Sequence, residues 1–323
     1  MNKVLGILSL AAMLGMQASP PALAQPYPTK PVRAILPLTP GGLGDVVLRA
    51  VSAELAKSLG QPVLVENRAG ASTLIGAEAC AKAAPDGYTI CLLAVETLSI
   101  APFVFKNVQF DPGRDFEPIT NLFFLTAGLM VNPSLGVNTL QEFIALARKR
   151  GDAMNYGSTA YNVQLFMNEF NKVNGTAIRY VPYKGGADAV NALLGNQVQA
   201  LFFGIGNLVG HLKSGRLKLL AIDGTARSPL FPDVPTLAES GYQGVQLRAW
   251  FGFLAPAGTP KPIVNRLHNE IARIASVPAF REQYFTRLGL EPILDTPEQF
   301  ARYLKEDQAK GRKLVKEAGL SVE

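Results

Sequence analysis

Patterns typical of buried strands alternate with patterns typical of amphipathic helices along almost the whole chain. Near-continuous runs of Val, Ile and Leu predict strands at 32–38, 61–67 and 88–95, because a strand that is buried on both faces has no polar side. Apolar residues at intervals of three or four predict helices at 46–59 and 72–84 between these strands. This order predicts a βαβαβ unit, in which ligands bind outside the carboxyl ends of the strands.

Two long extended segments, 118–133 and 245–256, flank a second run of alternating strands and helices, and three helical segments end the chain. Two extended segments that pass between the same two runs predict two lobes, with a cleft between them and a hinge at the crossings. The expected fold is therefore α/β, with a discontinuous first lobe formed by 25–125 plus 250–323 and a second lobe formed by 126–249.

Two of the expected helices begin with a capping-box pattern. Thr139 is followed three residues later by Glu142, and Thr296 by Gln299. In this pattern the hydroxyl accepts from a free N–H of the first turn, and the longer side chain returns to the cap residue. Both pairs therefore predict where a helix starts.

The first 24 residues have the three-part pattern of a secretory signal. A short positive start, 1–3, precedes an apolar stretch, 4–16, and small residues follow at Ala22 and Ala24. The apolar stretch is too short to span a bilayer as a helix, and no later stretch approaches that length. We expect export to the periplasm, cleavage after Ala24, and no membrane insertion.

Charge and composition narrow the classes of partner. The 323 residues contain 31 Lys and Arg against 25 Asp and Glu. Because the basic residues are spread along the chain, no nucleic-acid-binding face is indicated. We expect a monomer without nucleic-acid partners.

Cys80 and Cys91 are the two cysteines of the chain. An even number of cysteines in an exported protein permits a disulfide, and a helix packed on the next strand would bring these two together. The alternative is a pair of buried thiols that act as small apolar side chains. No histidine lies near either cysteine, so the sequence predicts no metal site here.

The glycine-rich turn "PLTPGGLGD" at 37–45 lies between a predicted strand and a predicted helix. A dinucleotide fingerprint would need a third glycine where Val47 stands, and a phosphate-binding P-loop would need Gly-Lys-Ser/Thr. Two interpretations stay open: a bare structural turn, and an anion site formed by unshielded backbone N–H groups at a helix start. We expect Asp45 to cap the helix instead of contacting an anion.

From end to end, the chain resembles the periplasmic solute-binding proteins of tripartite tricarboxylate transporters, the Bug or TctC family. The stretches that carry the resemblance are "YPTKPVRAILPLTPGGLGD", "LGQPVLVENRAGA", "AKAAPDGYTI", "VPYKGGADAVNALLGNQVQALF", "RSPLFPDVPTLAESGY" and "FGFLAPAGTP". The resemblance implies a two-lobed Venus-flytrap fold without a cofactor. It also implies a carboxylate ligand held between the lobes and transporter membrane subunits as partners.

The resemblance also implies site residues. From the first lobe they are Leu38, Thr39, Pro40, Gly41, Gly42, Gly44 and Asp45, and from the second lobe they are Ser158, Thr159, Ala160, Tyr161 and Asn162. The family's Pro-Tyr-Lys-Gly motif adds Tyr183, Lys184 and Gly185, although this lysine is also explained as a solvated loop charge. Ser158 and Thr159 place hydroxyls at a helix start, which suits a carboxylate oxygen or a bridging water.

Three positions depart from the family pattern. Glu96, followed by Thr97, comes directly after the third strand, where family members often carry Ser, Thr or Gly. This carboxylate either accepts a hydrogen bond from a ligand hydroxyl or amine, or points into solvent. Tyr161 replaces a small residue, and Phe203 replaces an aspartate. Together they favour a ligand with an apolar body, an aromatic or aliphatic dicarboxylate.

An enzymatic function lacks its usual residues. His211 and His268 are the two histidines, and the G-x-S-x-G, H-E-x-x-H and C-x-x-C motifs are absent from the sequence. A secreted hydrolase would need a nucleophile paired with a base. Binding without catalysis is therefore the expected function, and presentation of the ligand to a two-component sensor is an open alternative to transport.

Overall fold

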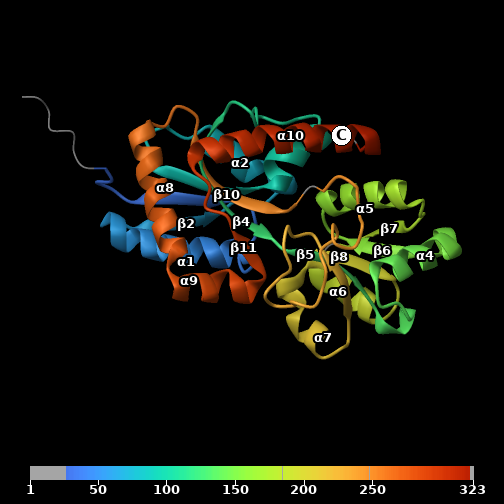
Figure 1. Cartoon of the computed structure of the whole chain (residues 1–323). Helices are drawn as coiled ribbons and strands as arrows, with labels where there is room; N and C mark the ends of the chain where they lie inside the picture. The colour runs from blue at the N-terminus through green and yellow to red at the C-terminus, as the bar shows by residue number, and fades with distance from the viewer. Residues whose placement is uncertain (1–26, 184, 247, 321–323) are drawn as a thin grey trace, which may run out of the picture.

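The computed structural model describes residues 27–183, 185–246 and 248–320. The expected signal sequence and its cleavage site lie outside these residues and stay predictions. The described elements form two α/β lobes, each built on one sheet (Figure 1). Within the described part of the chain, no helix has both the length and the apolar character that a membrane crossing needs.

The first lobe contains a six-stranded sheet in the order β11-β4-β10-β3-β1-β2. Its strands are β1 (Val32–Leu36), β2 (Val63–Asn67), β3 (Thr89–Ala94), β4 (Phe116–Leu125), β10 (Trp250–Pro256) and β11 (Leu290–Pro292). β1 pairs in parallel with β2 and β3, which confirms the βαβαβ unit. β10 enters antiparallel between β3 and β4, so the returning chain completes the first sheet.

Helices cover both faces of this sheet. They are α1 (Leu43–Leu59), α2 (Leu74–Ala81), α3 (Ala101–Val104), α8 (Lys261–Ser276), α9 (Pro278–Tyr284) and α10 (Pro297–Ala318), with the short 3₁₀ turns η1 (Ala71–Thr73) and η6 (Thr286–Leu288) and the π-helical turn η2 (Glu96–Ile100). α1 buries its apolar stripe, including Val51 and Leu55, in a core that it shares with Leu267 of α8. Gly60 ends α1 with φ 70°, the left-handed conformation that favours glycine.

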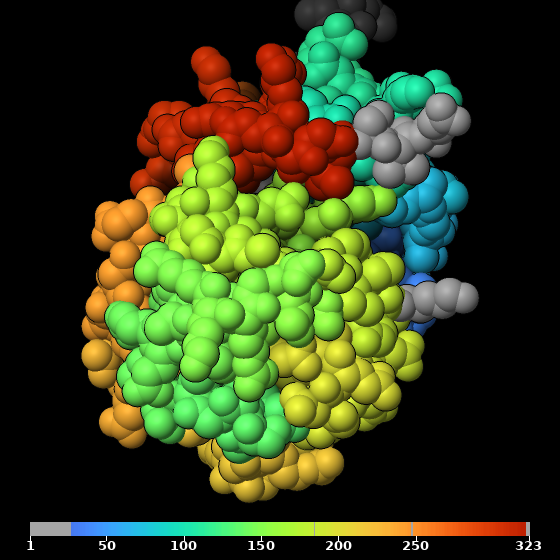
Figure 2. Space-filling view, turned by 90° about the vertical axis from the view of Figure 1, so that its right-hand side faces the viewer, coloured from blue at the N-terminus to red at the C-terminus, as the bar shows by residue number. Residues whose placement is uncertain are grey.

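The second lobe contains a five-stranded sheet in the order β7-β6-β8-β5-β9. Its strands are β5 (Ala127–Val131), β6 (Asn155–Ser158), β7 (Arg179–Pro182), β8 (Ala200–Gly204) and β9 (Lys218–Ile222). Its helices are α4 (Leu140–Arg150), α5 (Tyr161–Asn174), α6 (Gly186–Leu194) and α7 (Val209–Lys213), with turns η3 (Pro133–Leu135), η4 (Gly151–Ala153) and η5 (Ile205–Leu208). Figure 2, in which this lobe faces the viewer, shows α5 lying directly below the red C-terminal helix. Lys172 of α5 and Glu317 of α10 form an ion pair at 3.2 Å across this seam.

The chain passes between the lobes at two places. β4 continues into β5 after Thr126, and the chain returns to the first sheet where β10 begins at Trp250. All described strands before Thr126 and from Trp250 onward belong to the first sheet, and those between belong to the second. The lobe boundaries at 125/126 and 249/250 remain a proposal, which this membership supports.

The two capping-box predictions have different outcomes. At α10, Thr296 accepts from the N–H of Gln299 and Gln299 accepts from the N–H of Thr296, so the box is complete. At α4, Thr139 accepts from the N–H of Glu142 at 3.1 Å, as predicted. Glu142, however, accepts from the N–H of Asn138 at 2.6 Å, one residue before the cap, so only half of that box forms.

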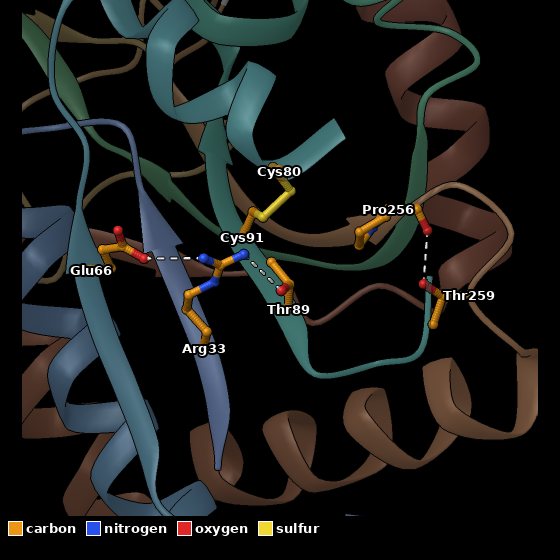
Figure 3. The surroundings of a disulfide bond; sticks show 7 residues. All are labelled: Arg33, Glu66, Cys80, Thr89, Cys91, Pro256 and Thr259. Atoms are coloured by element: carbon orange, nitrogen blue, oxygen red, sulfur yellow. Dashed lines mark hydrogen bonds and ion pairs between the residues drawn. A yellow bond between two sulfur atoms is a disulfide. The ribbon is translucent and has the colours of Figure 1, made fainter. Parts of the chain in front are cut away.

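The cysteines form a disulfide that joins α2 to β3 (Figure 3). Both residues are fully buried, and their Cα atoms are 6.3 Å apart. The sequence left a disulfide and a pair of buried thiols as alternatives. Packing of the helix on the next strand brings the cysteines together, and they form the disulfide.

Removing this disulfide should lower the free energy of unfolding. The bond closes a loop with a sequence separation of 11, and a loop of this size restricts the unfolded chain by about 3 kcal/mol. We expect C80A/C91A to lose roughly that amount in urea unfolding, since alanine places no polar group in the core. Wild-type protein unfolded after reduction serves as the control and should match the double variant. Unfolding midpoints that coincide with the oxidised wild type would contradict the prediction.

Candidate functional site

A cavity of about 390 Å³ lies between the two lobes. Its first wall follows the carboxyl ends of three parallel strands: Leu38 comes after β1, Thr73 after β2 and Glu96 after β3. Side chains gather here because the carboxyl ends of parallel strands meet at one edge of the sheet. The sequence-based expectation of a crevice at these strand ends therefore matches the position of the cavity.

The second wall comes from the other lobe and from the two crossings. It includes residues 158–163, from the end of β6 to the first turn of α5, together with Phe202 and Phe203 of β8. The crossings contribute Leu125, Ala127, Gln246, Arg248, Ala249 and Phe251. Most of these side chains are apolar, so the few polar groups among them decide which ligand the cavity can hold.

Glu96 connects the lobes at this cavity. Its carboxylate accepts backbone hydrogen bonds from Asn162 and Tyr161, at the first turn of α5. Burial raises the pKa of Glu96 to about 7, although these two bonds favour the charged form. Glu96 therefore points into the cleft, and one of its oxygens, Oε2, is shielded from solvent and has no hydrogen-bond partner.

Arg248 is the basic residue of the described cavity lining. Its Nη2 lies 2.6 Å from Oε2 of Glu291, and its side chain is only 12% exposed. The guanidinium also lies over the ring of Phe124, with its carbon 4.2 Å from the centroid. Its Nε is buried without a partner. A guanidinium has five N–H donors, and those that Glu291 leaves free suit a carboxylate.

Asp223 follows β9 and is a second acid in the lining. It is 5% exposed, and its Oδ1 accepts from the N–H of Ala127 at 2.9 Å. Burial raises the pKa of Asp223 to about 6, against the opposing effect of the Arg248 guanidinium. The cavity thus contains two acidic groups and one basic group among its described residues.

The turn η1 contributes strained backbone to the same wall. Ala71, Ser72 and Thr73 have positive φ values of 44°, 49° and 80°, which is rare for residues other than glycine and costly for a β-branched threonine. The hydroxyl of Thr73 is buried and has no partner. Strain of this kind is retained where the surrounding structure holds it in place, often at binding sites.

The structure brings together only part of the residue set that the sequence predicts. The predicted residues that line the cavity are Leu38, Glu96, Ser158, Thr159, Ala160, Tyr161, Asn162 and Phe203. Those outside its lining are Thr39, Pro40, Gly41, Gly42, Gly44, Asp45, Thr97, Tyr183 and Gly185. Lys184 lies outside the described residues. The ligand contacts assigned to all of these residues stay predictions.

The glycine-rich turn is exposed from Thr39 to Gly42. The N–H of Gly41 already donates to Oδ2 of Asp45 at 3.0 Å. Burial acts to raise the pKa of Asp45, but hydrogen bonds from Arg49, Gly41 and Asn67 outweigh it and hold the pKa at about 2. Asp45 therefore does not cap α1, whose N-cap is Gly42 without a side-chain bond. Its carboxylate instead accepts a hydrogen bond from the N–H of Gly41, the residue before the N-cap.

Six polar residues of the described cavity lining were missed by the sequence reasoning: Ser72, Thr73, Asn207, Asp223, Gln246 and Arg248. Arg248 is a single basic residue within the apolar return segment, and Asp223 ends an apolar strand. Each breaks an otherwise apolar run, which is the only sequence signal that could have found it.

His211 and His268 do not line the cavity, and Trp250 is fully buried in the core, where its Nε1 donates to Asp307 at 2.8 Å. The described residues contain no group of His, Cys, Asp and Glu that could hold a metal ion.

Comparisons with known proteins agree on one family. The model of the tripartite tricarboxylate transporter family receptor, TctC, matches residues 47–320. BugT of Bordetella pertussis is 33% identical, over 100% of this chain and 99% of the relative. The solved periplasmic binding protein BugD is 32% identical with a TM-score of 0.75, covering 91% of this chain and 99% of its own. Rpa4515 of R. palustris, solved with adipate, is 30% identical with a TM-score of 0.80, covering 91% and 99%.

These relatives share the two-lobed fold of periplasmic binding proteins, and the family is one of substrate-binding proteins. The family model and the full-length relatives together cover both lobes and both crossings. The chain belongs to the TctC family, the receptors of tripartite tricarboxylate transporters.

Proposed function

We propose that this chain captures a small organic carboxylate in the periplasm and delivers it, as a monomer, to the membrane subunits of a tripartite tricarboxylate transporter. The observation that carries the proposal is the interlobe cavity with Arg248 in its wall. Glu291 uses one nitrogen of the Arg248 guanidinium, so the group keeps N–H donors for an acid in the cavity. Family membership and the adipate-bound relative support the same class of ligand.

The walls favour a ligand with an aromatic or aliphatic body. Phe166, Phe202 and Phe203 line the cavity beside Tyr161, whose ring packs edge-on against Phe105 of the first lobe, with centroids 6.2 Å apart. The cavity volume of about 390 Å³ suits a molecule of roughly ten non-hydrogen atoms. The sequence pointed to dicarboxylates, so these belong among the ligands to be tested.

In this proposal, closure of the two lobes links ligand binding to transport. The second-lobe helix α5 contacts the first lobe through Glu96 and through the ion pair of Lys172 with Glu317. Membrane subunits that bind only the closed arrangement would receive only loaded protein. A ligand favours that arrangement to the extent that it contacts both walls at once.

The binding part of the proposal is tested with protein that has been freed of ligand by unfolding and refolding with the disulfide intact. Benzoate, terephthalate, hexanoate, adipate and malate are added singly, and binding is measured by calorimetry and by melting temperature. We expect at least one of these acids to bind with a micromolar Kd. An excess of about a hundredfold over that Kd should stabilise the protein by about 2.7 kcal/mol.

A pair of matched variants locates the site. Ala160 lines the cavity, whereas Ala153 is exposed on η4. A160F should abolish binding because its ring fills the cavity, and A153F should bind like the wild type. Equal binding by both variants, or no binding of any acid by the wild type, would contradict the proposal.

A second experiment tests the delivery step against a sensory role. It measures uptake of the bound acid by cells that contain the transporter subunits, with and without this chain.

A further inference from the structure

The start of α5 is already occupied by a carboxylate of the protein itself. The N–H groups of Tyr161 and Asn162 belong to the first turn, where backbone donors have no partner within the helix and attract anions. Glu96 reaches them from η2 of the opposite lobe. A ligand carboxylate can therefore use these donors only if it displaces Glu96.

The charges around the cavity disfavour a second acid group near Glu96. Glu96 and Asp223 are the acids of the described lining, and Arg248 is its basic residue. Glu291 already binds one nitrogen of Arg248. Two carboxylates that share an apolar site repel each other strongly, because few water molecules screen them. A ligand carboxylate at Arg248 meets the guanidinium as well as the acid Asp223 beside it, whereas a second carboxylate beside Glu96 meets an acid and no basic partner other than Arg248 in the described lining.

The groups that lack partners indicate what the ligand must supply. Oε2 of Glu96 is buried and has no partner. An ionised carboxylate only accepts hydrogen bonds, so its missing partner is a donor. Glu96 lines the cavity, and the terminal torsion of a glutamate side chain is soft, so rotation of the carboxylate can present an oxygen to a group in the cavity. A hydroxyl or amino group on the ligand satisfies it.

From this arrangement, and resting on the proposed function, we infer that the cavity selects acids with one carboxylate and a hydroxyl or amino group at the other end. The carboxylate binds at Arg248, and the hydroxyl or amino group donates to Glu96. The corresponding dicarboxylates bind more weakly. Glu96 is thus a residue that determines specificity, and its presence after β3 distinguishes this cavity from one with a small polar residue there.

Two pairs of probes with matched bodies test the inference. They are para-hydroxybenzoate with terephthalate, and ω-hydroxyhexanoate with adipate, measured by calorimetry at a mildly alkaline pH at which Glu96 is ionised. We expect the wild type to bind the hydroxy acid of at least one pair at least tenfold more tightly than its dicarboxylate, the ratio expected from one unsatisfied buried group. In E96Q that ratio should fall below about threefold or invert, since the amide can donate to a carboxylate.

A matched control separates a local effect from a general change of charge. Glu317 lies at the same seam between the lobes but outside the cavity lining, so E317Q should keep the wild-type preference. Equal or tighter binding of both dicarboxylates by the wild type overturns the inference and leaves the proposed function standing. A preference that persists in E96Q overturns the role of Glu96. If none of the four acids binds, the inference fails, and the proposed function fails with it when benzoate, hexanoate and malate do not bind either.

Discussion

Replacing Gly311 with alanine is expected to leave little folded protein. Gly311 is buried in the middle of α10, where that helix packs against η2. A Cβ atom at this position would lie 1.8 Å from the carbonyl oxygen of Ser99. Backbone atoms cannot rotate away as the end of a long side chain can, so the helix or the turn must shift. We expect a loss of about 4 kcal/mol, above the usual overpacking range of roughly 1–3 kcal/mol, because the clash is with backbone.

The effect is measured by urea unfolding, with the yield of folded protein as a second readout. Gly210 provides a matched control, because it lies within α7 and a Cβ there would meet nothing within 4 Å. G210A should unfold at the same urea concentration as the wild type or at a slightly higher one, since alanine is a better helix former than glycine. If G311A unfolds at the same urea concentration as G210A, the close approach of α10 to η2 is not a constraint on the fold.

The fold could be predicted from the sequence wherever local patterns determine it. The buried runs that became β1, β2 and β3 and the apolar stripe of α1 depend on residues a few positions apart, and such signals are strong. The position of β10 could not be predicted in the same way. It inserts antiparallel between β3 and β4, and pairing across more than a hundred residues leaves no periodicity in the sequence.

The residues that line the cavity also divide into those that a local sequence pattern marks and those that only the folded arrangement brings together. Ser158 to Asn162 could be predicted because a family pattern with hydroxyls marks a helix start. The contact of Glu96 with α5 could not, since it exists only when the two lobes come together. Asp223 and Arg248 each stand alone in an apolar run, and a single charged residue is usually exposed at the surface. Only the three-dimensional arrangement of the two lobes shows that both face one cavity.

Replacing Arg248 with methionine is expected to abolish carboxylate binding and to destabilise the fold. Methionine keeps much of the length of the side chain but removes the charge. Glu291 then loses its partner at 2.6 Å, and the pKa of buried Asp223 loses the influence that lowers it. Arg248 is 12% exposed but Glu291 is 37% exposed, so solvent screens the pair and its loss costs roughly 1–2 kcal/mol, between the values for an exposed and a buried pair. Removing the charged donor should weaken binding of the best acid at least a hundredfold, about 2.7 kcal/mol.

The double variant R248M/E291Q separates these two effects. Neutralising Glu291 removes the carboxylate that R248M leaves unpaired, so most of the lost stability should return in urea unfolding. Binding should not return, because the donor for the ligand acid is still absent. If the double variant instead binds the acid like the wild type, Arg248 only supports the wall and the acid lies elsewhere. A double variant that regains stability without affinity assigns the acid group to Arg248, because a destabilised wall can then no longer explain the loss of binding.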